Sequence, residues 1–62
     1  MPKYRVQQFH QSEDEFLELG GLQTLDLTTD EETTLLEHDG EITWVETRRG
    51  YFALASEEPV DE

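Results

Sequence analysis

The residues that could carry chemistry gather around His38, which has carboxylates on both sides. Glu37 and Asp39 flank it and Glu41 follows, a mixture that could hold a hard metal ion or transfer a proton. A hard cation such as Ca²⁺ needs about six or more oxygen ligands, and this segment lacks the spacing and the central glycine of a calcium-binding loop. The pattern is more typical of a solvated turn, and we expect no metal here.

No other pattern in the sequence indicates catalysis. His10 lies among glutamines, and the pair Gly20-Gly21 lacks the lysine of a phosphate-binding loop. The absence of cysteine excludes disulfides and thiolate metal sites. Two carboxylates acting as acid and base would need a cleft, which 62 residues can hardly build. We therefore expect a protein that is not an enzyme and that uses no cofactor.

Two adjacent arginines, Arg48 and Arg49, make up half of the four basic residues. A guanidinium pair can grip phosphate or carboxylate through paired hydrogen bonds. Affinity for nucleic acid, however, comes largely from basic side chains on phosphates, and a chain of net charge −12 is repelled by a polyanion. We interpret the pair as internal partners of carboxylates such as Glu46, and expect no direct binding of nucleic acid.

The dominant feature is negative charge. Twelve of the sixteen carboxylates lie between Val6 and Thr47, a stretch of 42 residues without lysine or arginine. Unpaired like charges repel, so such a chain either relies on salt to screen them or uses the field that they make. The carboxylates that we predict to bind a partner fall into three clusters: Glu13, Asp14, Glu15 and Glu18; Asp30, Glu31 and Glu32; Glu37, Asp39 and Glu41.

Length and composition indicate one small domain. A chain of 62 residues buries only about 60% of its unfolded surface, so its stability is marginal, and forming a homodimer is one way to enlarge the core. We predict a folded domain over residues 1–55. Residues 56–62 hold four carboxylates, a proline and one apolar residue, which predicts a disordered acidic tail.

The sequence has no apolar run long enough for a membrane span and no apolar stretch of a secretion signal near its amino terminus. We therefore expect a cytoplasmic protein that does not contact a membrane.

Six aromatic side chains also distinguish the chain from acidic disordered segments, which usually have few.

The best-defined predicted elements are two consecutive hairpins. Asp39-Gly40 lies between β-prone residues 33–38 and 41–47, a combination typical of a two-residue hairpin turn. Residues 48–50 then turn the chain into a strand over 51–55, with Thr47 placed opposite Tyr51. In this register one face of the sheet carries the predicted core: Leu35, Ile42, Trp44, Phe52 and Leu54. The alternative is that Trp44 and Tyr51 are exposed binding anchors, but their spacing favours the core for Trp44.

The amino-terminal half predicts a strand over residues 4–9, with Tyr4 and Val6 on one face and Phe9 on the other, and a second strand over 22–27. Between them, residues 12–15 fit a capping box, which favours a short helix that Gly20-Gly21 would end. The alternative there is an extended segment over residues 16–19.

A second capping box at residues 29–32 allows a helix over residues 30–38, but the threonines favour a strand. The predicted fold class is α+β and mainly β. It comprises an antiparallel sheet of three to five strands with two hairpins and one short helix in the amino-terminal half, the sheet being open or a half-closed barrel.

Three functions fit this surface. The leading hypothesis is an acidic protein-binding module, an inhibitor or regulator that covers the basic surface of a nuclease or polymerase, with a phage-type nucleic-acid mimic as its most specific form. The second is a small structural or assembly domain of a halophile, whose acidity is salt adaptation and whose single lysine, Lys3, fits that origin. The third is an antitoxin-like accessory subunit that folds fully only on its partner.

Overall fold

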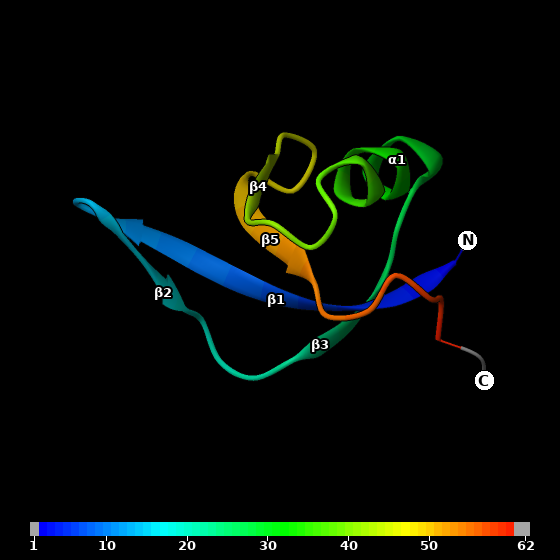
Figure 1. Cartoon of the computed structure of the whole chain (residues 1–62), viewed down its shortest axis with the longest axis horizontal. Coiled ribbons are helices and arrows are strands. Elements are labelled where there is room, and N and C mark those ends of the chain that lie inside the picture. Colours follow the sequence, from blue (N-terminus) through cyan, green and yellow to red (C-terminus); the bar gives the residue numbers. More distant parts are fainter. Residues whose placement is uncertain (1, 61–62) are drawn as a thin grey trace.

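A computed structural model describes residues 2–60 of the chain (Figure 1). The elements in chain order are β1 (Lys3–Ser12), β2 (Glu15–Glu18), β3 (Gln23–Asp26), α1 (Thr29–Glu37), β4 (Thr43–Val45) and β5 (Gly50–Leu54). They form a small α+β domain, mainly of strands, around one antiparallel sheet. The predicted fold class is confirmed, and of the two predicted forms the sheet takes the open one.

The long strand β1 organises the sheet. One of its edges pairs with β2 near its carboxyl end, where Ser12 lies opposite Glu15, and with β3 near its amino end. The other edge pairs with β5, and β4 follows β5 at the outside. The order is therefore β2-β1-β5-β4, with β3 beside β2 along the same edge of β1.

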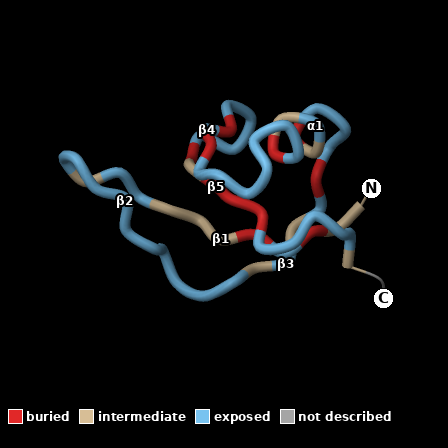
Figure 2. Tube along the Cα trace, viewed as in Figure 1, coloured by how far each residue is buried: buried red, intermediate tan, exposed pale blue. Residues whose placement is uncertain are grey.

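The core lies between one face of this sheet and α1, where the buried segments converge in Figure 2. Val6 is fully buried on β1, and Phe52 and Leu54 lie on the same face of β5. Leu35 of α1 packs onto this face, and Leu27, in the connection from β3, is also buried. The predicted strand over residues 4–9, with Tyr4 and Val6 facing inward, is confirmed.

The helix predicted from the capping box at residues 12–15 is wrong. Glu13 and Asp14 form a two-residue turn instead, with Glu13 at φ 55°, and the following residues are extended as in the alternative prediction. Gly20-Gly21 leave room for about two helical turns, too short to be stable without packing, whereas β1 offers an edge whose amides and carbonyls need partners. The strand predicted over 22–27 is present as β3.

The helix of the described residues is α1, so the predicted strand over residues 33–38 and the hairpin at Asp39-Gly40 are also wrong. The alternative prediction of a helix there is correct, although its capping box begins one residue earlier than expected. The Thr28 hydroxyl accepts from the amide of Glu31, whose carboxylate accepts from the Thr28 amide at 2.9 Å. These caps and the burial of Leu35 outweigh the weak helix propensity of the threonines.

The hairpin of β4 and β5 is present, but its register is three residues away from the predicted one. Trp44 lies opposite Tyr51, and Val45 lies opposite Gly50. An odd shift exchanges the two faces of a strand, so Val45 is buried while Ile42 and Trp44 are exposed, contrary to prediction. The other predicted core residues, Leu35, Phe52 and Leu54, are buried.

The register has two physical causes. Gly50 falls on the buried face, where a Cβ atom would lie 3.2 Å from the ring of Phe52. The four-residue loop before it is held at Thr47 and Arg48, which both bind the carboxylate of Glu31 on α1. The turn is thus fixed by a contact with a distant part of the chain.

The carboxyl-terminal segment returns along the amino end of β1. The amide of Ala55 donates to the carbonyl of Arg5, and that of Val60 donates to the carbonyl of Lys3. Residues 61–62 of the predicted acidic tail lie outside the described residues, and the disorder of the tail stays a prediction. Within residues 2–60 no helix has the length and apolar character needed to cross a membrane.

Candidate protein-binding surface

The predicted partner-binding carboxylates do not gather on one side of the molecule. Glu13, Asp14, Glu15 and Glu18 are exposed on the hairpin of β1 and β2, which we call the arm, residues 9–19. The turn of the arm lies at one end of the long axis, which measures 36 Å, and α1 lies toward the other end (Figure 1). The other predicted carboxylates that are exposed belong to α1 and the loop after it: Asp30, Glu37, Asp39 and Glu41.

Glu31 and Glu32 were also predicted to bind a partner, but both are engaged within the fold. Glu31 is only 5% exposed, and its carboxylate accepts hydrogen bonds from Thr47, from Arg48 and from the amide of Thr28. Glu32 is half-buried and accepts a hydrogen bond from the hydroxyl of Tyr4, which raises the pKa of that tyrosine. We therefore remove Glu31 and Glu32 from the candidate surface.

The surroundings of Glu31 make its contribution to stability depend on pH. Burial alone would raise its pKa, but the hydrogen bonds from Thr47 and Thr28 and the charge of Arg48 outweigh burial and lower the pKa from 4.5. A folded-state pKa below the unfolded value stabilises the fold at higher pH, and this contribution is lost as pH falls through the folded value. We expect the difference in unfolding free energy between the native chain and Glu31→Gln to shrink below about pH 4.5. Urea titrations at several pH values would measure it, and a difference that is constant down to acid pH would contradict the assignment.

Arg48 and Arg49 have different environments although they are adjacent. The Nε atom of Arg48 lies 3.1 Å from a carboxylate oxygen of Glu31, and its Nη2 donates to the carbonyl of Asp26. The predicted internal pairing is thus confirmed for Arg48, with Glu31 instead of Glu46 as its partner. Arg49 is exposed at φ 54° at the end of the loop.

This contrast predicts opposite results for two matched substitutions. Arg48→Ala should lower the free energy of unfolding by about 1–3 kcal/mol, because it removes charged hydrogen bonds from a buried carboxylate. Arg49→Ala should change it by less than about 0.5 kcal/mol, as for other exposed residues. Urea denaturation followed by far-UV circular dichroism compares the two variants, and equal losses would argue against the Glu31 contact.

A row of aromatic rings, exposed at its two ends, crosses the sheet face that points away from α1. Phe16 of β2, Tyr51 of β5 and Trp44 of β4 form this aromatic row, with 5.0 Å between the ring centroids of each neighbouring pair. Both pairs meet edge to face, at interplanar angles of 68° and 66°. Phe16 is 40% exposed and Trp44 is 44% exposed. Contiguous apolar patches on the surface of soluble proteins often mark binding sites, which makes the row a candidate site.

Sequence reasoning missed the aromatic row because it placed Trp44 in the core. The signal that could have identified it is the alternation in residues 43–45 and 50–54. Once Val45 and Phe52 are taken as buried, Trp44 and Tyr51 must face the other side. Phe16 joins them because Gln11, its partner across the strands, lies on the face that carries Tyr51.

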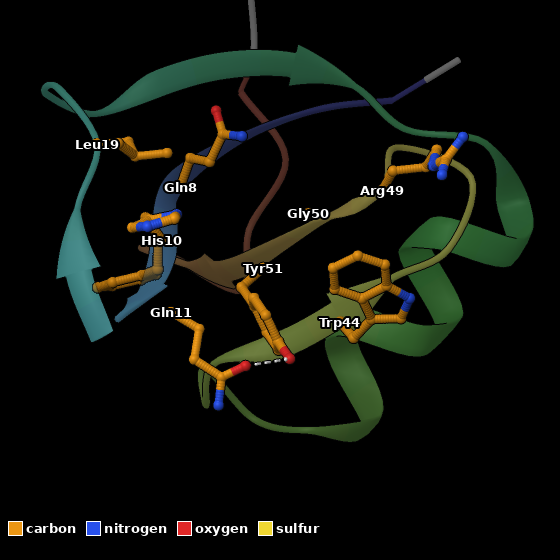
Figure 3. Close-up of a pocket in the computed structure, with 9 residues that line it drawn as sticks. Gln8, His10, Gln11, Leu19, Trp44, Arg49, Gly50 and Tyr51 are labelled. Atoms are coloured by element: carbon orange, nitrogen blue, oxygen red, sulfur yellow. Dashed lines mark hydrogen bonds between the residues drawn. The ribbon is translucent and has the colours of Figure 1, made fainter. Parts of the chain in front are cut away.

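A shallow depression of about 370 Å³ adjoins the row (Figure 3). Its lining comes from β1, the residue after β2, β4, the end of the loop between β4 and β5, and the start of β5. It includes Gln8, His10, Leu19, Arg49 and Tyr51. The Tyr51 hydroxyl donates to the side-chain oxygen of Gln11 at 3.0 Å. Among residues 2–60 no hydrogen bond joins His10 to a carboxylate, and no group of three or more His, Asp or Glu side chains is placed to hold a metal ion. The depression offers hydrogen-bonding groups to a ligand but no assembled acid-base pair.

The arm adds exposed apolar side chains to its carboxylates. Leu17 and Leu19 are about half exposed, and the backbone of β2 pairs with β1, while Phe16 of β2 contacts Tyr51 of β5. The outer edge of β2 is unpaired in the described sheet. A short edge strand that carries Glu15 and Glu18 resists unspecific pairing, while its apolar residues remain available to a partner.

Comparisons with protein families, with curated proteins and with solved structures give no match for this chain. Its function is therefore inferred from the chemistry of its surface.

Proposed function

We propose that this chain is an acidic protein-binding module, an inhibitor or regulator that covers a basic surface of a partner such as a nuclease or polymerase. The observation that carries the proposal is the combination of exposed carboxylates on the arm with the exposed aromatic row beside it. No lysine or arginine interrupts the chain between Val6 and Thr47. The arm and the aromatic row share Phe16, so carboxylates and aromatic rings lie near each other.

The aromatic row supplies what charge alone does not. Tryptophan and tyrosine are the residues that most often dominate binding energy at protein interfaces, because they bury a large area at a small entropic cost. Carboxylates at the rim add less to affinity, but they speed association with a basic partner and exclude acidic ones. This division of roles fits a protein-binding module better than a protein whose surface charge serves only to keep it in solution.

The most specific form of the hypothesis, a mimic of nucleic acid, needs carboxylates in a regular row. Glu15 lies opposite Ser12 and Glu18 lies opposite Phe9, which places the two carboxylates on opposite faces of β2. The arm therefore presents carboxylates around its tip instead of along one face. We accordingly propose that the arm occupies a basic groove of the partner, and that its carboxylates do not match the phosphates of a nucleic acid one by one.

Affinity capture tests this proposal. The chain is immobilised through its carboxyl end and exposed to extract of the native host, and retained proteins are identified at low and moderate salt. The matched variants each remove three charges: Glu13→Gln/Asp14→Asn/Glu15→Gln on the arm and Glu37→Gln/Asp39→Asn/Glu41→Gln at the end of α1 and in the loop after it. We expect the native chain and the second variant to retain a basic, nucleic-acid-binding protein, and the arm variant to lose it. Added nucleic acid should displace this protein from the native chain. Retention of no such protein at low salt would refute the proposal.

Salt dependence separates function from adaptation to a saline cytoplasm. Under the proposal the melting temperature should rise between about 0.01 and 0.2 M KCl, as the Debye length falls from about 30 Å to below 10 Å, and should then level off. Scanning calorimetry at increasing KCl measures this. A melting temperature that continues to rise strongly to molar KCl would indicate that the acidity is salt adaptation.

A further inference from the structure

The aromatic row has a chemical character that restricts what can cover it. Phe16, Tyr51 and Trp44 come from β2, β5 and β4, with β1 between the first two, so the row crosses four strands. With 5.0 Å between neighbouring ring centroids, the rings at the two ends lie at most about 10 Å apart. A row of this length can contact more than one side chain of an extended partner segment, since residues on one side of such a segment repeat about every 6.6 Å.

Carboxylates accompany the row at both ends. A carboxylate oxygen of Glu46 lies 2.7 Å from the indole nitrogen of Trp44, which donates to it. Glu18 lies opposite Phe9, and Phe9 lies opposite Tyr51, so Glu18 shares the face of the row on the side of β2. The faces of aromatic rings are themselves negative because of their quadrupole. The row therefore combines partly exposed aromatic rings with flanking carboxylates.

Several occupants fit this character poorly. A purely apolar partner would desolvate Glu18 and Glu46 without giving them hydrogen bonds, which costs free energy. A nucleic acid could stack its bases on the rings, but its phosphates would meet a chain of net charge −12. A second copy of this chain would bring the same carboxylates against each other.

Arginine matches every part of the row. A guanidinium plane stacks on aromatic faces and at the same time forms paired hydrogen bonds with carboxylates, which an ammonium group does less well. We propose that the aromatic row is a binding platform for arginine side chains of an extended, arginine-rich segment of a partner protein. This rests on the proposed function and names the chemistry of the partner at one site.

The single tryptophan of the chain makes the site directly observable, because Trp44 fluorescence reports on the row alone. The full chain is titrated at low salt with an oligoarginine peptide and an oligolysine peptide of equal length. We expect a saturable change of Trp44 emission, with arginine bound about fivefold or more tightly than lysine. Phe16→Ala should weaken the arginine peptide about tenfold, while Leu22→Ala, which changes an exposed residue outside the row, should leave it unchanged.

Three outcomes would overturn the platform. In the first, both peptides bind with equal affinity, Phe16→Ala leaves this affinity unchanged, and the arm variant Glu13→Gln/Asp14→Asn/Glu15→Gln loses it. This result would assign binding to charge alone and leave the proposed function standing. No binding of either peptide at low salt would count against both. In the third, Trp44 emission changes with the concentration of the chain in the absence of peptide, and sedimentation shows a dimer that Phe16→Ala abolishes. This result would mean that a second copy of the chain covers the row.

Discussion

Glu31→Ala is expected to lower the free energy of unfolding by about 3 kcal/mol, which is a large part of the total for a domain of this size. The substitution removes one carboxylate that makes three contacts. It accepts hydrogen bonds from the Thr47 hydroxyl and the Thr28 amide, and it pairs with Arg48. Because these contacts join α1 to the loop between β4 and β5, their loss weakens the attachment of the helix to this hairpin. The variant should be largely unfolded in urea concentrations that the native chain resists.

The comparison that isolates this effect is Glu37→Ala, at the other end of α1. Glu37 is exposed and its substitution removes one charge without disturbing a buried contact, so a change within about 0.5 kcal/mol is expected. Urea denaturation followed by circular dichroism measures both variants. Equal stability of the two would mean that the Glu31 contacts contribute nothing beyond the removal of a negative charge.

Trp44→Ala is expected to reduce affinity for the basic partner about 30-fold or more while the chain stays folded. A central aromatic residue of an interface is typically worth about 2 kcal/mol or more, which corresponds to this factor. Trp44 is 44% exposed and contacts Tyr51 edge to face, so its loss should cost about 0.5–1.5 kcal/mol of stability.

The control for this prediction is Phe52→Ala in the core. Phe52 is 4% exposed, and its removal should cost about 3–5 kcal/mol. Circular dichroism gives the stability of both variants, and isothermal titration calorimetry with the captured partner gives the affinity. A Trp44→Ala chain that unfolds like Phe52→Ala would return Trp44 to the core, and a folded one with native affinity would remove it from the interface.

The parts of the fold that the sequence predicts well are those with local causes. The alternation of Tyr4 and Val6 with polar residues identifies β1, and the turn before Tyr51 places the last hairpin. The helix was misplaced because residues 12–15 and residues 28–31 both satisfy a capping box. Burial of Leu35 decides between them, and burial depends on the sheet that β1 and β5 form together.

The candidate surface was harder to predict because it depends on register. A shift of three residues between β4 and β5 moves Trp44 from the core to the surface and creates the aromatic row. One of the two causes of this register is Glu31, which the sequence shows only as one more carboxylate in an acidic run. Its role follows from contacts with Thr47 and Arg48, residues far along the chain whose proximity no local pattern indicates.

The most direct test of the account is the affinity of the captured basic partner for three forms of the chain at low and moderate salt. These are the native chain, Trp44→Ala and the arm variant Glu13→Gln/Asp14→Asn/Glu15→Gln. The account predicts that both variants bind the partner more weakly than the native chain does. Added salt should weaken partner binding by the native chain and by Trp44→Ala more than binding by the arm variant, and nucleic acid should compete with the native chain for the partner. Affinities that are the same for all three forms would contradict it.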